Sequence, residues 1–167
     1  MGRLLLLRHG EAAPDGPGGR DHARPLSARG RASAGAVGAW LERGGVRPDR
    51  VLCSSAARAR ETWAAIEAVL GAADAPIDTR LEDDLYLASR PTLVETLARL
   101  GPGADCILVV GHNPGLSELA AWLDPDAREP IRMPPAALAL FELRVDDWGD
   151  LAPGAAELQT LRLPETP

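Results

Sequence analysis

Short apolar runs that stop abruptly at polar residues constrain the fold of this chain more than any other feature of its sequence. Four leucines at positions 4–7 lead directly into Arg8 and His9, and a second run at 106–110 ends just before Gly111 and His112. An apolar run without polar alternation is typical of a strand buried on both faces, as in a parallel sheet covered by helices. The runs therefore predict central strands whose ends carry polar groups.

Helical segments alternate with these strands along the chain. Those with helical apolar spacing and recognisable start or stop residues lie at 27–44, where Ser27 is the expected N-cap, 57–70, 89–101 and 114–123. The segments with strand character lie at 4–7, 49–55, 76–81 and 106–110. Two further segments, 137–145 and 157–163, alternate more, as antiparallel or edge strands do. This order predicts a three-layer α/β/α sandwich with a mostly parallel central sheet. No linker divides the sequence, so we expect residues 1–167 to form a single domain.

The composition excludes several classes of partner. The formal net charge is -6 and no block of basic residues is present, so we expect no nucleic-acid partner. The leading apolar run is too short for a signal peptide, and no run approaches the roughly 18 apolar residues of a membrane span. We therefore expect no membrane association and a cytoplasmic location. Cys53 and Cys106 lack metal-ligand spacing, and we interpret them as buried free thiols rather than a disulfide.

Polar groups follow three of the predicted parallel strands. Arg8 and His9 follow the first, Ser54 and Ser55 end the second, and His112 follows the run at 106–110. The carboxyl ends of parallel strands meet at one edge of a sheet, and ligands bind in the crevice outside that edge. We therefore expect these side chains to share one crevice.

Three segments carry a family resemblance at this point. LLRHGE with its RHG motif, SSAARARET and VVGHNPG, in this order and each at a strand end, resemble the histidine phosphatase superfamily. The short chain and the segments RPLSARG and GHNPGL are similar to the small bacterial phosphohistidine phosphatase branch, over residues 3 to about 145. The resemblance implies a phosphoglycerate mutase-like fold without a large lid insertion, and a metal-independent phosphatase that needs no cofactor.

The resemblance also implies a role for each matched residue. His9 would be the nucleophile, since a neutral imidazole is nucleophilic and a phosphohistidine intermediate divides one displacement into two easier steps. Arg8 and Arg58 would bind the phosphoryl oxygens, because arginine stays charged and offers a planar fork of donors. His112 would stabilise the developing charge, most effectively when protonated. Asn113 is a further candidate phosphate contact.

The proton donor for the leaving group is left open by the sequence. The candidate carboxylates are Asp84, Asp83 and Glu82 in LEDDLY, Glu11 beside the RHG motif, and Asp15 or Asp21 in the first loop. A run of carboxylates is equally typical of a solvated loop. A phosphoramidate nitrogen also carries its own proton into departure more readily than an ester oxygen, so a phosphohistidine-directed enzyme needs no such acid.

The other charged residues near the motifs are expected to lie outside the reaction centre. Arg20 or Arg24 is expected to line the mouth of the crevice, whereas Arg60 should face elsewhere. His22 is interpreted as an exposed loop histidine without a role. Arginines beside both family histidines would repel a dication, so we expect no metal site.

The size of the chain bears on the substrate. Little sequence separates the helix at 57–70 from the strand at 106–110, which predicts a shallow, open site. Such a site accepts a phosphorylated side chain of a protein, above all phosphohistidine, or a small phosphate ester, and releases inorganic phosphate. Alternatives are a small-molecule phosphomonoesterase, a phosphoglycerate mutase-like enzyme, and a phosphate- or phosphoprotein-binding module without turnover. Hydrolysis is favoured over mutase chemistry, because a mutase must enclose its intermediate from water.

Overall fold

Six strands form one central sheet in the order β3-β2-β4-β1-β5-β6. The computed structural model describes residues 2–71 and 75–165. In chain order the helices and strands are β1 (Arg3–Arg8), α1 (Ala28–Arg43), β2 (Arg50–Ser54), α2 (Ala57–Leu70), β3 (Asp78–Glu82), α3 (Arg90–Leu100), β4 (Cys106–Gly111), α4 (Gly115–Leu123), β5 (Leu138–Leu143) and β6 (Ala156–Arg162). The first four strands of the sheet order are parallel, while β5 is antiparallel to β1 and to β6. The predicted mostly parallel sheet is confirmed. The two strands predicted to be antiparallel or at an edge are β5 and β6; both are antiparallel to their neighbours, and β6 lies at an edge.

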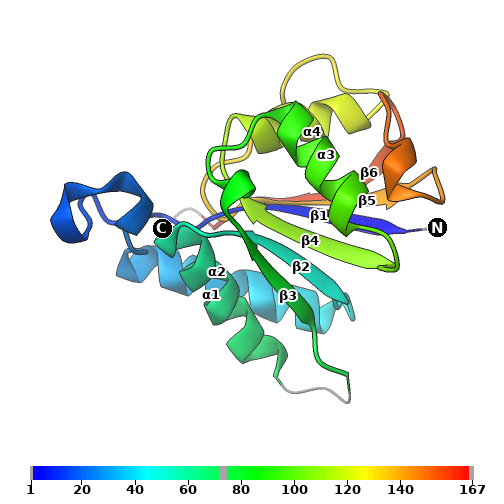
Figure 1. The fold of residues 1–167 in the computed structure, drawn as a ribbon. Helices are drawn as coiled ribbons and strands as arrows, with labels where there is room; N and C mark the ends of the chain where they lie inside the picture. The colour runs from blue at the N-terminus through cyan, green and yellow to red at the C-terminus, as the bar shows by residue number, and fades with distance from the viewer. Residues whose placement is uncertain (1, 72–74, 166–167) are drawn as a thin grey trace.

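Helices cover both faces of this sheet. Figure 1 shows α1 and α2 on one face and α3 and α4 on the other. Leu5 and Leu7 pack into the cluster under α1 and α2, whereas Leu4 and Leu6 pack into the cluster under α3 and α4. All four leucines are fully buried. The apolar run is continuous because both faces of β1 are covered, which confirms the three-layer sandwich.

Local signals in the sequence mark the starts of two helices, α1 and α3. The Ser27 hydroxyl accepts a hydrogen bond of 3.0 Å from the Gly30 amide at the start of α1, as expected for an N-cap. Ser89 caps α3 in the same way, by accepting a hydrogen bond of 3.4 Å from the Thr92 amide.

Among the helices of the described residues, none has both the length and the apolar character needed to cross a membrane.

Two cysteines lie in the central strands β2 and β4. Cys53 and Cys106 are both buried, and neither forms a disulfide. Burial raises the pKa of the Cys53 thiol to about 12 and that of the Cys106 thiol to about 11. The expectation of buried free thiols is confirmed.

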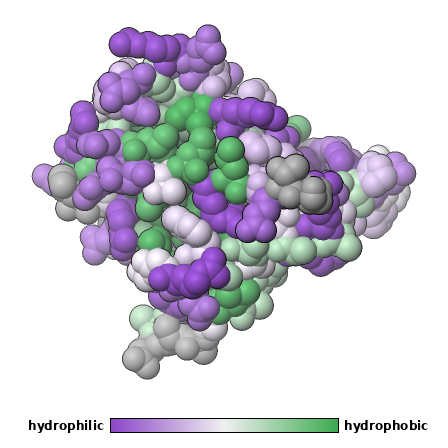
Figure 2. All heavy atoms as spheres, turned by 180° about the vertical axis from the view of Figure 1, so that it is seen from behind, coloured by the Kyte–Doolittle hydropathy of each residue, from purple (hydrophilic) through white to green (hydrophobic). Residues whose placement is uncertain are grey.

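The outer surface is mostly hydrophilic. On the side turned away in Figure 1, apolar residues gather in one central area surrounded by hydrophilic ones (Figure 2). The large apolar side chains that are more than half exposed are Leu81, Leu87 and Leu163.

The parallel register brings the polar strand ends together. Arg8 pairs with Gly111 at the ends of β1 and β4, and Ser54 pairs with Glu82 at the ends of β2 and β3. The loops after these strands therefore share one edge of the sheet, where ligands bind in folds of this kind.

Candidate active site

His9 lies at the end of β1 with its ring held in one tautomer. The ring is buried, and Nδ1 lies 2.7 Å from the Gly10 carbonyl oxygen, so Nδ1 carries the proton and donates it. The Arg58 Nε group donates to Nε2 at 3.2 Å. Nε2 therefore carries a lone pair and points toward the guanidinium group, which is the form of imidazole that attacks an electrophile.

The backbone after His9 is fixed by a contact with α1 and α2. The Gly10 amide donates to the Thr62 hydroxyl at 3.0 Å, and this hydroxyl donates to the Arg58 carbonyl at 2.7 Å. A Cβ atom at Gly10 would lie 2.7 Å from the Gly30 carbonyl oxygen in α1. Glycine is needed here because the backbones of the loop after β1 and of α1 meet at this point.

Two residues other than glycine have positive φ within the described ranges, and both flank this site. Ala136, with φ of 65°, donates its amide to the carbonyls of Arg8 and His9 at 3.1 and 3.0 Å. Leu87, with φ of 50°, directly follows Tyr86. Such conformations cost of order 1–3 kcal/mol each and persist where the surrounding structure requires them. The surrounding structure thus holds Ala136, which contacts the end of β1, and Leu87, which follows β3, in backbone conformations that these residues rarely adopt.

Arg58 connects the loop after β1 with both family histidines. It lies in the first turn of α2, is 4% exposed, and follows Ala56, which provides no side-chain cap. Its Nε and Nη2 face the histidines, with Nη2 3.5 Å from His112 Nδ1. Its Nη1 and Nη2 donate to the Asp21 carbonyl at 2.8 Å and to Asp21 Oδ2 at 3.1 Å. One edge of the guanidinium fork therefore faces the histidines and the other faces the loop.

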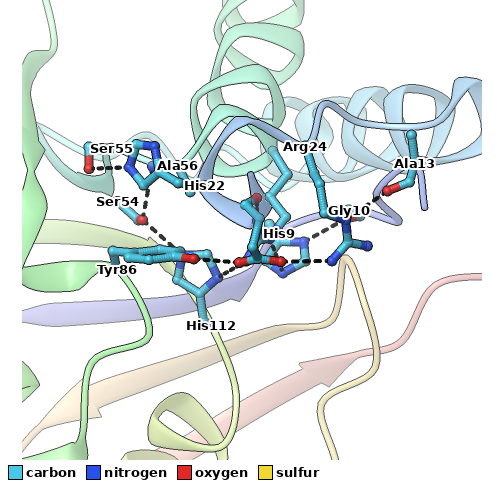
Figure 3. A network of polar contacts seen from close by, with 12 residues as sticks. His9, Gly10, Ala13, His22, Arg24, Ser54, Ser55, Ala56, Tyr86 and His112 are labelled. Atoms are coloured by element: carbon cyan, nitrogen blue, oxygen red, sulfur yellow. Dashed lines mark hydrogen bonds and ion pairs between the residues drawn. The ribbon is translucent and has the colours of Figure 1, made fainter. Parts of the chain in front are cut away.

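His112 follows β4 and completes the floor of the site. Its ring is 3% exposed and its centroid lies 5.0 Å from that of His9. Its Nε2 lies 2.8 Å from the Ser54 hydroxyl at the end of β2. Its ring centroid lies 5.5 Å from that of Tyr86, and the two rings are nearly perpendicular. Figure 3 shows His9, Tyr86 and His112 lying side by side. The three strand ends expected to converge do lie together.

The environment keeps both imidazoles neutral. Burial lowers the pKa of His9 to about 4, with further lowering from Arg58 and Arg8, although the bond to Gly10 opposes it. Burial, then His9 and Arg58, lowers the pKa of His112 to about 3. His112 is therefore neutral in this structure, because a buried ring beside a guanidinium group loses its proton. Its protonation beside a bound anion stays a prediction. A bound oxyanion would act in the opposite direction.

These shifts predict a loss of stability in weak acid. An unfolded histidine binds a proton near pH 6.5, whereas the folded rings do so only near pH 4 and 3. The unfolded chain therefore takes up more protons as the pH falls from 6.5 to 4.5, and each ring lowers the free energy of unfolding by roughly 2 to 3 kcal/mol over that window. Urea unfolding at several pH values measures this decline. His112→Gln should make it shallower and the exposed His22→Gln should not; equal curves for all three proteins would contradict the assignment.

Arg8 and Asn113 lie beside the histidines on another side. Arg8 Nη1 donates to the Met133 carbonyl at 3.2 Å, while its buried Nε has no partner within the described part of the chain. The Asn113 amide donates to the same carbonyl at 2.8 Å and accepts from Ser117 at 3.1 Å. All these side chains line a cavity of about 350 Å³. Arg8 thus has a free donor, whereas the proposed phosphate contact of Asn113 is not supported, because both ends of its amide are engaged.

The carboxylates of LEDDLY do not reach the histidines. Arg99 of α3 lies 3.6 Å from Glu82 and 3.5 Å from Asp84. Asp83 is exposed at the start of a short 3-10 turn. Across residues 2–71 and 75–165, none of the three contacts His9, Arg58 or His112. The geometry gives no support to a general acid at these positions, because Arg99 engages two of the three carboxylates.

Glu11 is also turned away from the site. It accepts a hydrogen bond of 2.8 Å from Ser27 and lies 3.7 Å from Arg29 at the start of α1. This carboxylate therefore supports the helix start, where negative charge is favourable, and is not placed as a proton donor. Among the residues described, no cluster of three potential ligands with metal-binding geometry occurs.

Asp21 and Tyr86 are the residues whose roles sequence reasoning missed. Asp21 was considered only as a rival acid, but hydrogen bonds from Tyr86, Arg24 and Arg58 hold the pKa of its carboxyl well below the usual range. The Tyr86 hydroxyl donates to Oδ2, and Arg24 donates to Oδ1 at 3.0 Å. His22 is exposed, as expected, yet it lies at the rim with its ring edge-on to Tyr86 at 4.8 Å. A tyrosine in LEDDLY and an aspartate in RDHARP were the only signals available.

Two buried imidazoles beside two guanidinium groups define a site for an oxyanion such as a phosphoryl group. The family model for the histidine phosphatase superfamily (branch 1) matches residues 4–85. An uncharacterised protein of Mycobacterium tuberculosis is 37% identical over 95% of this chain and 99% of its own length. The chain belongs to the histidine phosphatase superfamily.

Solved structures of similar fold support this family membership. A candidate phosphohistidine phosphatase SixA from Nakamurella multipartitia is 32% identical, with a TM-score of 0.83 over 99% of this chain and 97% of that one. The protein histidine phosphatase SixA in complex with tungstate is 25% identical, with a TM-score of 0.80 over 97% of both chains. This chain is therefore similar in fold and length to SixA-like phosphatases, and the phosphoglycerate mutase-like fold without a large insertion is confirmed.

Proposed function

We propose that this protein is a metal-independent phosphatase that transfers a phosphoryl group to His9 and then to water, and that its substrate is phosphohistidine in another protein. One observation carries the proposal. The unprotonated Nε2 of His9 faces Arg58 and lies beside His112, on a ring whose other nitrogen donates to the Gly10 carbonyl. A nucleophile in its reactive tautomer next to donors for an oxyanion is the arrangement that phosphoryl transfer requires.

The proposed reaction has two displacements. Arg58, Arg8 and His112, the last protonated once the anion is bound, hold the phosphoryl oxygens. The Nε2 lone pair of His9 attacks phosphorus as the bond to the leaving atom breaks. A water molecule then attacks the phosphohistidine, which releases inorganic phosphate and restores Nε2. The arginines contribute mainly by stabilising charge that spreads over the equatorial oxygens.

The positions of the candidate proton donors support phosphohistidine as the substrate class. Glu82 and Asp84 pair with Arg99. Glu11 accepts a hydrogen bond from Ser27. These three carboxylates are therefore not placed to give a proton to an alkoxide leaving group. A phosphoramidate nitrogen that already carries charge or a proton on its ring departs as a neutral amine or imidazole. The similarity to SixA-like phosphatases supports the same choice.

A substrate panel tests this proposal. We expect the protein to hydrolyse a phosphohistidine peptide with a kcat/KM at least about tenfold above that for glycerate and sugar phosphates, a difference of about 1.4 kcal/mol in the barrier. A chelator should leave the rates unchanged. Comparable rates on many esters would favour a phosphomonoesterase instead, and absence of turnover on every substrate would favour a binding module.

A further inference from the structure

The carboxylate of Asp21 lies directly outside the floor of the site. The side chains of the floor are almost fully buried: His112 is 3% exposed, Arg58 4% and His9 8%. The Asp21 side chain that contacts Arg58 is 47% exposed. The carboxylate therefore borders the buried floor on its solvent side, which is the side from which a substrate reaches His9 and on which we place the leaving group.

This position is unusual for an anion. A site for a phosphoryl dianion is weakened by a negative group at its entrance, and Asp21 uses two donors of the same guanidinium group that would bind the phosphoryl oxygens. The groups that face the carboxylate are Arg24 of its own loop, Arg58 of α2, Tyr86 after β3 and His112 after β4. With two arginines and a phenol as donors, the group is an anion and not a proton donor at neutral pH.

The Arg58 fork leaves room for both anions. Nη1 and Nη2 bind Asp21, whereas Nε and Nη2 face His9 and His112. A phosphoryl group on the histidine side thus uses the other edge of the fork. The carboxylate remains beside it, on the side of the leaving group.

We propose that Asp21 selects substrates whose leaving group is a nitrogen that carries a proton, by accepting a hydrogen bond from that group. This inference rests on the proposed function. In phosphohistidine the ring nitrogen without phosphorus binds a proton, and its N–H donates to Asp21. The carboxylate stabilises this cationic ring. The His9 Nε2–P bond forms, the substrate P–N bond breaks, and its electron pair returns to the ring, which departs as neutral imidazole with its proton in place.

The same carboxylate disfavours phosphate esters. An ester oxygen gains negative charge as it leaves and offers no donor to Asp21, so the two groups repel one another. The ring of Tyr86 lies at the same rim, next to His112, where it can contact the flat imidazole of the substrate. One loop residue, Asp21, thus accounts for two properties of the proposed reaction: the leaving group needs no acid to protonate it, and a nitrogen leaving atom is preferred over an oxygen leaving atom.

Asp21→Asn tests the assignment with two substrates, a phosphohistidine peptide and p-nitrophenyl phosphate. The exchange keeps the size of the side chain and removes its charge. We expect the ratio of kcat/KM for the peptide over the ester to fall by about tenfold or more, as for a lost hydrogen bond to a charged group. The alkaline limit of peptide hydrolysis should also move to lower pH, because the substrate ring loses its proton more readily without the carboxylate.

Two further variants complete the design. Asp15→Asn, an exposed carboxylate of the same loop, should leave the ratio unchanged. Tyr86→Phe removes a donor to Asp21 but keeps the carboxylate, so the ratio should not fall. Equal losses on both substrates in Asp21→Asn would show that Asp21 only orients Arg58 and would overturn the proposal, as would an unchanged ratio or a fall of the same size in Tyr86→Phe. Absence of turnover by the unaltered protein would contradict the proposed phosphatase itself.

Discussion

His9→Ala should lose turnover by about 10⁴-fold or more, the equivalent of roughly 5.5 kcal/mol of barrier. The reason is that the substitution removes Nε2, the atom proposed to attack phosphorus, which the bond from Nδ1 to the Gly10 carbonyl leaves without a proton. The floor of arginine and His112 would remain, so oxyanion binding should survive better than turnover. Steady-state kinetics on a phosphohistidine peptide gives the first quantity, and competition by tungstate gives the second.

Detection of the phosphohistidine intermediate tests the same prediction directly. Rapid acid-free quenching of the unaltered protein should capture an acid-labile phosphoenzyme, and His9→Ala should yield none. The matched control is His22→Ala, an exposed histidine on the rim that bonds to Ser55 at 2.9 Å. Full activity in His9→Ala, or a phosphoenzyme that persists in it, would exclude the proposed nucleophile.

Arg58→Ala should have the second-largest effect, a loss of about 10³-fold in kcat/KM, or roughly 4 kcal/mol of transition-state stabilisation. The side chain is buried, donates to His9 and contacts His112 and Asp21, so its removal deletes a charge-assisted donor and leaves the Asp21 carboxylate facing the histidines. Both kcat and the affinity for tungstate should fall. Arg58→Lys should recover little, because an ammonium group cannot present two edges.

Arg60→Ala is the control for this prediction. Arg60 lies in the same helix turn with the same chemistry but is exposed, and it has no contact with either histidine in the described structure. Its replacement should change kcat/KM by less than about twofold, as is usual for surface substitutions. If both variants lost activity equally, the effect would arise from α2 or from net charge rather than from the contacts of Arg58.

The fold was predictable because its strongest signals are local. The runs at 4–7 and 106–110 are continuous because both faces of β1 and β4 are covered, and Ser27 marks the start of α1 by itself. Polar residues at the strand ends then meet as a consequence of parallel pairing. The sequence therefore indicates the positions of His9, Arg58 and His112 without any knowledge of their distances.

The acids and the entrance were not predictable, because they depend on contacts between distant residues. Asp84 is a plausible acid until Arg99, on the following helix, is seen beside it. Asp21 contacts residues 37 and 65 positions away, Arg58 and Tyr86, and its loop of glycine and proline gives no periodic signal. Side-chain composition near a motif identifies what a residue is able to do, but tertiary pairing decides whether it is free to do it.

The two buried thiols have a consequence for oxidative stress. Oxidation of cysteine begins from the exposed thiolate, and phosphatases that use such a group as nucleophile lose activity to peroxide at the same step. Here Cys53 and Cys106 are buried in β2 and β4, and both hold their protons far above neutral pH. With a ring nitrogen as the proposed attacking atom and neither sulfur ionised, the proposed reaction does not depend on a group of the kind that peroxide oxidises in thiol-based enzymes.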